Sequence, residues 1–401
     1  MVRQIAARVE AIRGLRFRGL PRLEVMSEAR LAALGRRLAR QAQRREDSNP
    51  TRVRRMRRLE RASVRFDQLA GLLPPQVSFG PDARGGLDRI GGAYDYKHRR
   101  IVLVPGFIQT WVQLQYTLAH ELTHALEDQH FNLRLDALTQ PGEATAVRRA
   151  VTEGTATYVQ DRYRQRYLHD QLPVRQRLQG MRSVIGAGGG AYAVNAQAVF
   201  DYVDGAIFVR DLVHRSGDWR LVRRALERPP HRSQQLLHPR TWPQAAPVRR
   251  IRLGIANSLK GSWVRIGGGP AGEEQALTIL LAGTIDSEAL VGASGWDGGR
   301  FAVWRPRASS SCGDGCAARD VGVIAFRWHH ATDPHQFGLA VPAYMIAGLF
   351  AQPINERTWR IGDGYAALGT AARASALAFA PTASLSESLA SRAAQAAAGS
   401  G

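Results

Sequence analysis

One segment constrains this chain more than any other feature: residues 117–127 read Thr-Leu-Ala-His-Glu-Leu-Thr-His-Ala-Leu-Glu. We expect a helix here, because these are mostly good helix formers and neither Pro nor Gly interrupts them. Residues four apart on a helix differ by about 40° in rotation, so His120 and His124 project from one face. Two neutral imidazoles at that spacing can share one Zn²⁺ ion, and Glu121 beside them can accept a proton from water. The alternative is a helix with two ordinary surface histidines.

The composition is that of a globular protein with an unusual excess of positive charge. The 401 residues suffice for two or three domains, and 44% of them are hydrophobic. The formal charge of +21 comes almost wholly from arginine. The arginines are scattered without interleaved aromatic residues, and their densest run, 52–58, fits the solvated face of a helix. We therefore expect no specific nucleic-acid partner, and polyanion binding remains an alternative function.

Three further features bear on where the protein works. No stretch reaches the roughly 18 apolar residues that span a bilayer, so we expect no transmembrane segment. Residues 1–6 lack the apolar core of a signal peptide, which favours the cytoplasm, or export if the start is truncated. Cys312 and Cys316 form either a small loop disulfide or two free thiols. The oligomeric state stays open.

The order of periodic segments predicts an α+β chain with a mainly helical, zincin-like catalytic region and a small sheet. We expect strands at 101–104, 248–255, 301–305, 321–328 and around 359–361, and helices at 108–126, 142–166, 196–226, 273–281 and 333–349. The expected regions are an N-terminal helical region (1–80), a catalytic domain (81–245), a C-terminal α+β region (246–382) and an Ala/Ser-rich tail (383–401) that is weakly helical or disordered.

A third zinc ligand must come from outside the pair of histidines, and Glu153 is the strongest candidate. It lies 29 residues after His124, on a second helix that can pack antiparallel to the first. A carboxylate there completes a His₂Glu set, one of the known catalytic zinc sites. Small residues at Gly154 and Ala156 would let the two helices approach closely. The alternative is an exposed helix glutamate.

Two other residues compete for the third position. His130 has the spacing of the third metzincin histidine, but Glu127 stands where that pattern needs a glycine to turn the chain out of the helix. If the helix continues, His130 points roughly 100° away from the other two histidines. Glu143 is also within reach, although a carboxylate in the first turn of a helix already has a favourable interaction with the helix dipole.

These segments resemble the gluzincin branch of zinc metallopeptidases, and more closely a group of bacterial proteins within it. The resemblance rests on 118–131 and 151–157, with shorter echoes at 92–95, 227–230, 237–239 and 295–298. It implies zinc ligation by His120, His124 and Glu153, with Glu121 as catalytic base. Many gluzincins place an Asp four residues after the ligand Glu to orient a histidine, whereas this chain has Thr157 there. Asp128 and Asp161 are the other acidic residues considered for that role.

The predicted activity is peptide hydrolysis by a zinc-activated water, with Glu121 transferring the proton to the leaving amine. His238 and Tyr158 are candidate donors to the oxyanion, and each could equally be a packing residue. A peptide or protein substrate could add to the 101–104 strand if that strand forms a sheet edge. The competing function is a zincin-fold binding protein that no longer turns over substrate.

Overall fold

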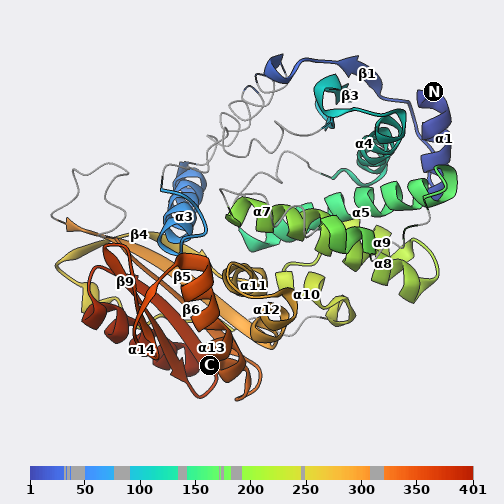
Figure 1. The fold of residues 1–401 in the computed structure, drawn as a ribbon. Helices are drawn as coiled ribbons and strands as arrows, with labels where there is room; N and C mark the ends of the chain where they lie inside the picture. The colour runs from blue at the N-terminus through green and yellow to red at the C-terminus, as the bar shows by residue number, and fades with distance from the viewer. Residues whose placement is uncertain are drawn as a thin grey trace.

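The computed structural model describes residues 1–30, 33, 37, 50–75, 91–133, 142–170, 172, 176–181, 192–244, 249–307 and 320–400. These residues form helices and two β-sheets, which confirms the predicted α+β class (Figure 1). Both cysteines, Cys312 and Cys316, lie outside the described residues. No helix of the described residues is long and apolar enough to cross a bilayer.

A helical part surrounds the two predicted histidines. Its helices are α1 (Val2–Arg13), α4 (Trp111–Phe131), α5 (Glu143–Tyr167), α7 (Tyr192–Ala198), the π-helical segment η4 (Val199–Asp204), α8 (Gly205–Ser216), α9 (Arg220–Glu227) and α10 (Ser233–Leu237). The α4 helix packs against α5 on one side and carries α1 on the other, and α5 also packs along α8. The core between α1, α4 and α5 is apolar and includes Val9, Leu122 and Val159.

A three-stranded sheet lies beside α4, with strands β1 (Arg22–Val25), β2 (Gly92–Asp95) and β3 (Arg100–Leu103) in the order β1-β3-β2. The expected strand at 101–104 is therefore present as β3. It is central, however, because it pairs in parallel with β1 and antiparallel with β2. The expectation that this strand offers a free edge was wrong. Among the described strands the outer one next to α4 is β2, which contacts that helix.

A seven-stranded antiparallel sheet organises the rest of the chain, which we call the sheet part. In the order β4-β5-β6-β10-β9-β8-β7, its strands are β4 (Trp263–Pro270), β5 (Trp296–Pro306), β6 (Val321–Trp328), β10 (Ala374–Ala380), β9 (Gly364–Ala371), β8 (Thr358–Ile361) and β7 (Gln352–Asn355). Its helices are α3 (Pro50–Leu69), α11 (Glu273–Leu281), α12 (Asp286–Ala293), α13 (Asp333–Ala343), the π-helical η9 (Tyr344–Gly348) and α14 (Ala383–Ala398). Short 3₁₀ turns are η2 (Pro105–Phe107), η5 (Pro239–Thr241) and η6 (Asn257–Leu259).

The two faces of this sheet carry different cores. On one face, Phe66 from α3 and Phe337 from α13 pack with Phe326 of β6 in a cluster rich in aromatic residues. On the other face, α14 packs its alanines on small residues of β6, β9 and β10. The structure therefore places the tail in a packed helix, with Leu389 and Ala393 fully buried, and not in a disordered segment.

The sheet part differs from the expectation in two respects. Residues 249–255, expected as a strand, have no regular secondary structure, although Ile251 and Ile255 are buried against the α14 face. Strands β9 and β10 were missed because they are rich in Ala and Gly, which have low strand propensity. Their small side chains are required by packing, since a Cβ at Gly369 would lie 2.2 Å from the Ala390 carbonyl oxygen of α14.

The first 80 residues, expected to form one region, supply elements to both parts of the molecule. Helix α1 packs on α4 and α5, whereas α3 packs on β4, β5 and β6. Figure 1 shows the two helices at opposite sides of the molecule. Sequence proximity is thus a poor guide to spatial grouping at this end of the chain.

Candidate metal centre

Two helices position the candidate ligands. Helix α4 begins after Thr110, whose hydroxyl accepts a hydrogen bond from the Gln113 backbone N–H at 3.0 Å, and it ends at Asn132 in a left-handed conformation. It contributes His120 and His124, and the packed neighbouring helix α5 contributes Glu153. The helix continues through Glu127, as the sequence predicts when glycine is absent from that position.

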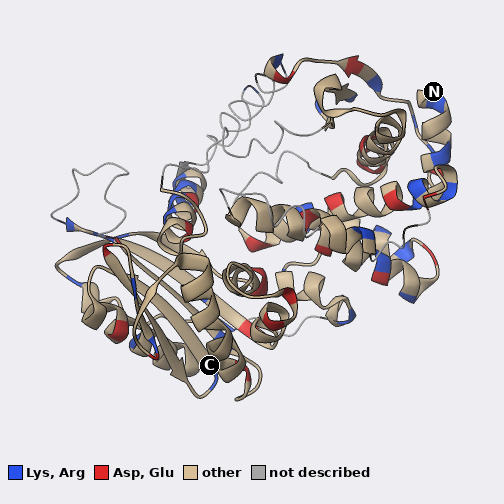
Figure 2. Cartoon of the chain, viewed as in Figure 1, with Lys and Arg blue, Asp and Glu red and all other residues tan. Residues whose placement is uncertain are grey.

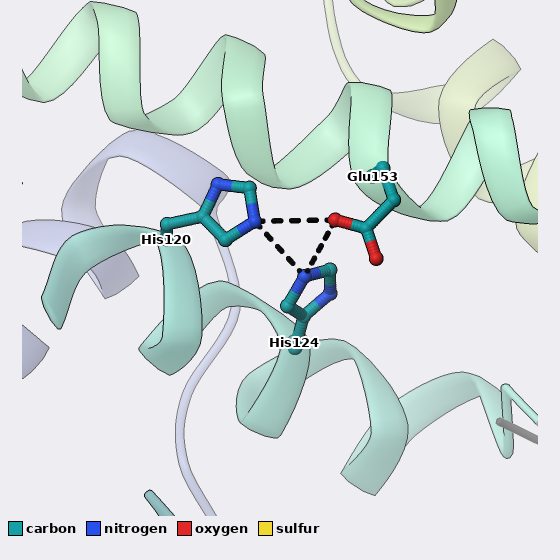
Figure 3. Close-up of side chains that lie close together, drawn as sticks. All are labelled: His120, His124 and Glu153. Atoms are coloured by element: carbon teal, nitrogen blue, oxygen red, sulfur yellow. Dashed lines mark hydrogen bonds and ion pairs between the residues drawn. The ribbon is translucent and has the colours of Figure 1, made fainter. Parts of the chain in front are cut away.

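The three predicted ligands come together at one point between these helices (Figure 3). One Glu153 carboxylate oxygen, Oε2, lies 3.2 Å from His120 Nε2 and 3.2 Å from His124 Nε2. The two Nε2 atoms are 3.1 Å apart. Figure 3 shows both imidazoles and the carboxylate pointing into the same space.

The spacing of these three atoms fits a tetrahedral metal site. Ligand atoms about 2.0–2.1 Å from a tetrahedral zinc ion lie roughly 3.3 Å from one another. The observed sides of 3.1 and 3.2 Å are close to that value. A set of two imidazole nitrogens and one carboxylate oxygen is also a donor set that zinc accepts. His120, His124 and Glu153 could therefore hold a zinc ion together.

The electrostatics of the three residues are strongly coupled. Burial favours the neutral form of His124, but the negative charge of Glu153 raises the pKa of His124 to about 9. Burial also opposes ionisation of Glu153, yet the neighbouring His124 and His120 hold the pKa of its carboxyl well below the usual range. The Glu153 carboxylate is thus ionised at neutral pH, in the state a metal ligand needs.

Glu121 lies next to the ligands and is buried, with 5% of its surface exposed. Burial and the Glu153 charge raise the pKa of its carboxyl, while His120 and His124 lower it. The Tyr94 backbone N–H of β2 donates a hydrogen bond to the carboxylate. A buried carboxylate with a raised pKa is suited to take up and release a proton.

Gln160 holds the His120 ring, a role that the sequence had not revealed. Its Oε1 lies 3.1 Å from His120 Nδ1, so that nitrogen carries the proton and Nε2 presents its lone pair to the site. Gln160 lies seven residues after Glu153 on α5, two helical turns along the same face. That spacing is the one sequence signal that could have identified it.

The other positions considered for orienting a histidine do not contact the site. Asp128 accepts a hydrogen bond from the Tyr94 hydroxyl at 3.3 Å, and Asp161 forms an ion pair with Arg177 at 2.6 Å. Thr157, which stands at the gluzincin Asp position, is buried, and its hydroxyl has no hydrogen-bond partner among the described residues. The same holds for Nδ1 of His124.

Tyr202 is a second residue that sequence reasoning missed. It lies in the π-helical segment η4, and its ring centroid is 6.0 Å from that of His120. The Glu153 charge, together with burial, raises the pKa of the Tyr202 hydroxyl well above its ordinary value. The hydroxyl therefore remains a hydrogen-bond donor beside the three ligands. Neither a motif nor a spacing in the sequence marks this residue.

Gly154 has a different partner from the one the sequence suggested. A Cβ at Gly154 would lie 2.2 Å from the backbone carbon of Gly205 in α8, and one at Gly205 would lie 2.1 Å from the Ala150 carbonyl oxygen. The two glycines therefore let α8 approach α5, not α4. Because η4 leads directly into α8, this contact also sets the position of Tyr202.

The rejected ligand candidates have structural partners elsewhere. His130 Nε2 lies 2.8 Å from the Arg16 carbonyl oxygen, which ties the end of α4 to the chain after α1. Glu143 accepts hydrogen bonds from the Ser233 backbone N–H and hydroxyl at 2.8 and 2.7 Å. Glu143 therefore joins α5 to α10 at the first turn, where the helix dipole also favours a carboxylate.

Neither predicted oxyanion donor is brought to the three ligands. Nε2 of His238, at the end of α10, lies 2.7 Å from the buried Glu273 of α11. Tyr158 belongs to an apolar cluster between α5 and α8 and meets the Trp219 ring edge-on at 5.7 Å. Among the described contacts, neither residue interacts with His120, His124 or Glu153.

Comparison with known proteins adds nothing to this geometry, because no protein-family description, curated protein or solved structure matches the chain. The residues of the site themselves therefore carry the functional interpretation.

Proposed function

We propose that this protein is a zinc-dependent peptidase with a zincin-like catalytic region. The observation that carries the proposal is the triangle of His120 Nε2, His124 Nε2 and Glu153 Oε2, with sides of 3.1–3.2 Å. A zinc ion bound there supplies Lewis acidity, which activates a water molecule and polarises a carbonyl. The resemblance to gluzincins, which rests on the same residues, supports this choice of chemistry.

Glu121 is the general base and general acid of the proposed reaction. Its carboxylate accepts the proton of the attacking water and later gives it to the leaving amine. The burial that raises its pKa makes the carboxylate a better acceptor for the proton of the water.

Tyr202 replaces His238 and Tyr158 as the proposed oxyanion donor. Its phenol lies beside His120 and keeps its proton at neutral pH because Glu153 and burial disfavour the phenolate. A hydroxyl that donates to the developing negative charge of a tetrahedral intermediate lowers the barrier of acyl transfer.

The outer strand β2 is the proposed binding edge for the substrate. Gly92 of β2 lies directly on α4, since a Cβ there would be 3.0 Å from a methyl of Thr117 and 3.2 Å from Cγ of Glu121. An extended peptide that pairs with β2 would therefore run past the catalytic carboxylate. This supports a peptide or protein as the substrate class.

Paired substitutions on α4 test the proposal. Glu121→Gln should retain zinc and lose at least about a hundredfold in hydrolysis of unfolded casein, because the base is gone and the ligands remain. His124→Gln should lose the zinc itself, whereas His130→Gln, on the same helix but bonded to Arg16, should keep both zinc and activity. Zinc content is measured by mass spectrometry alongside hydrolysis. Wild-type activity in Glu121→Gln would contradict the role of Glu121 as the base. Zinc loading without any hydrolysis by the wild type would leave a binding protein as the function.

A further inference from the structure

A row of exposed arginines follows one side of α3, far from the candidate ligands in the chain. Arg54, Arg57, Arg58 and Arg61 lie at i, i+3, i+4 and i+7, so they share one helix face over about 10 Å. All four are exposed. Figure 2 shows the positive charges repeated along this helix.

Strand β4 lies beside this row and adds a fifth arginine to it. Arg58 Nε lies 3.3 Å from the Ile266 carbonyl oxygen, and its terminal nitrogen lies 3.4 Å from that of Arg265. The helix sits tightly on the strand, because a Cβ at Gly267 would lie 2.5 Å from the Arg58 carbonyl oxygen. Arg265 is itself exposed beside this contact. We call Arg54, Arg57, Arg58, Arg61 and Arg265 the arginine ridge.

Among the residues that the structure describes, no carboxylate forms an ion pair with any ridge arginine. Burial, together with the positive charges of Arg300 and Arg58, lowers the pKa of Arg265. By contrast Arg65, one turn further along α3, pairs with the buried Asp320 at 3.1 Å. Arg65 is thus neutralised by a carboxylate, whereas the ridge arginines have no ion-pair partner in the described part of the chain.

We propose that the arginine ridge binds the phosphodiester backbone of double-stranded nucleic acid without sequence specificity. Guanidinium groups pair with phosphates through two parallel hydrogen bonds. When they neutralise phosphates, counterions condensed on the nucleic acid are released, and this release supplies the affinity. A fixed helix that presents arginines on successive turns can contact several phosphates at once. This inference concerns α3 and β4 and does not depend on the proposed peptidase activity.

The surroundings of the ridge favour a duplex over two other polyanions. A membrane-binding helix needs large apolar side chains beside its basic residues, but the apolar side of α3, with Leu59 and Phe66, faces the sheet. Val264 is the one large apolar side chain of α3 or β4 that is exposed among the described residues. Single strands are held by exposed aromatic rings, and no exposed aromatic residue occurs on either element.

Charge reversal tests the ridge in the full-length protein. The triple variant Arg54→Glu, Arg57→Glu, Arg61→Glu spares Arg58, which contacts β4. The matched control reverses Arg223, Arg228 and Arg240, which are also exposed and change the net charge equally. Binding to a short duplex DNA of random sequence is measured by fluorescence anisotropy between about 50 and 200 mM salt.

The ridge variant should bind the duplex at least about tenfold more weakly, and the slope of log affinity against log salt should fall by about 2.7, or 0.9 per lost phosphate contact. The control should change affinity by less than about threefold. Arg54→Gln, Arg57→Gln, Arg61→Gln gives the same test if the Glu variant does not fold. Equal weakening by both sets, or tighter binding of the wild type to phosphatidylserine vesicles than to the duplex, would overturn the proposal. Casein hydrolysis by the ridge variant should equal that of the wild type. A failure of the duplex-binding proposal can therefore be distinguished from a failure of the peptidase proposal.

Discussion

The helical part and the sheet part of this molecule differ in what their buried charged and apolar side chains surround. Beside the candidate ligands, the helical part buries charged groups such as the Arg13–Glu127 ion pair, at 2.5 Å with side chains at most 1% exposed. The sheet part buries aromatic rings on one face and alanines on the other. The sheet part also holds a buried ion pair, Arg65 with Asp320 at 3.1 Å, so the burial of charge alone does not separate the two parts. In the helical part the buried charges lie around the three candidate ligands, and this arrangement points to chemistry there.

The largest expected effect in the helical part follows from removing Glu153. Glu153→Ala deletes one of three candidate ligands and should weaken zinc binding by about a thousandfold or more, roughly 4 kcal/mol. Competition against a zinc chelator measures the change. Glu143→Gln, ten residues earlier on α5 and bonded to Ser233, should keep the wild-type zinc affinity. Equal zinc affinity in Glu153→Ala and wild type would contradict the assignment of a zinc site to the helical part.

In the sheet part the largest expected effect is on stability alone. Phe326 is fully buried, with ring centroids 5.8 Å from Trp328 and 5.6 Å from Phe337. Phe326→Ala should lower the free energy of unfolding by about 3–5 kcal/mol, because it leaves a cavity. Urea unfolding measures the loss, and zinc affinity should not change. A parallel loss of zinc affinity would show that the two parts are not energetically separate.

A smaller effect is expected at Tyr202. Tyr202→Phe removes the hydroxyl beside His120 and should reduce kcat by about a hundredfold, with zinc content unchanged. Tyr158→Phe is the matched control, because that ring lies in an apolar cluster, and it should retain nearly full activity. Equal losses in the two variants would argue against a specific role for Tyr202 in catalysis.

The sequence predicted the parts of the site that depend on local geometry. The pairing of His120 and His124 follows from helical periodicity. The helix was expected to end at residue 126 and in fact runs on to Phe131, which agrees with the absence of glycine at Glu127. Tyr202 could not be predicted in the same way. Its place depends on a π-helical segment and on the contact between Gly154 and Gly205, which join elements about fifty residues apart.

The fold was predictable where apolar periodicity was strong. Strand β6 and helix α11 have the expected bounds. Strands β9 and β10 were missed because their composition is dictated by α14, which needs small residues such as Gly369 beneath it. The strand propensity of these residues cannot indicate a packing constraint that comes from a helix far along the sequence.

The smallest expected effect concerns carboxyl groups where α3 and α11 meet. Burial, together with the charge of Glu274, raises the pKa of Asp67 to about 8. Burial, together with the charges of Asp201 and Glu143, raises that of Glu274 to about 7. The unfolded chain releases these protons at much lower pH, near the ordinary values of 3.8 and 4.5. Between about pH 4 and pH 8 the folded protein therefore binds more protons than the unfolded chain, and its stability should fall as pH rises.

Asp67→Asn tests this dependence, because an amide keeps the shape of the neutral acid and cannot ionise. The variant should lose less stability than the wild type when pH is raised from about 5 to about 6, by a difference on the order of 1 kcal/mol. Urea midpoints across that range measure it. Glu10→Gln, a change at a surface ion pair with Arg16, should leave the pH dependence unaltered. Identical pH profiles for wild type and Asp67→Asn would mean that Asp67 is already ionised in the folded protein, like Glu153 of the helical part.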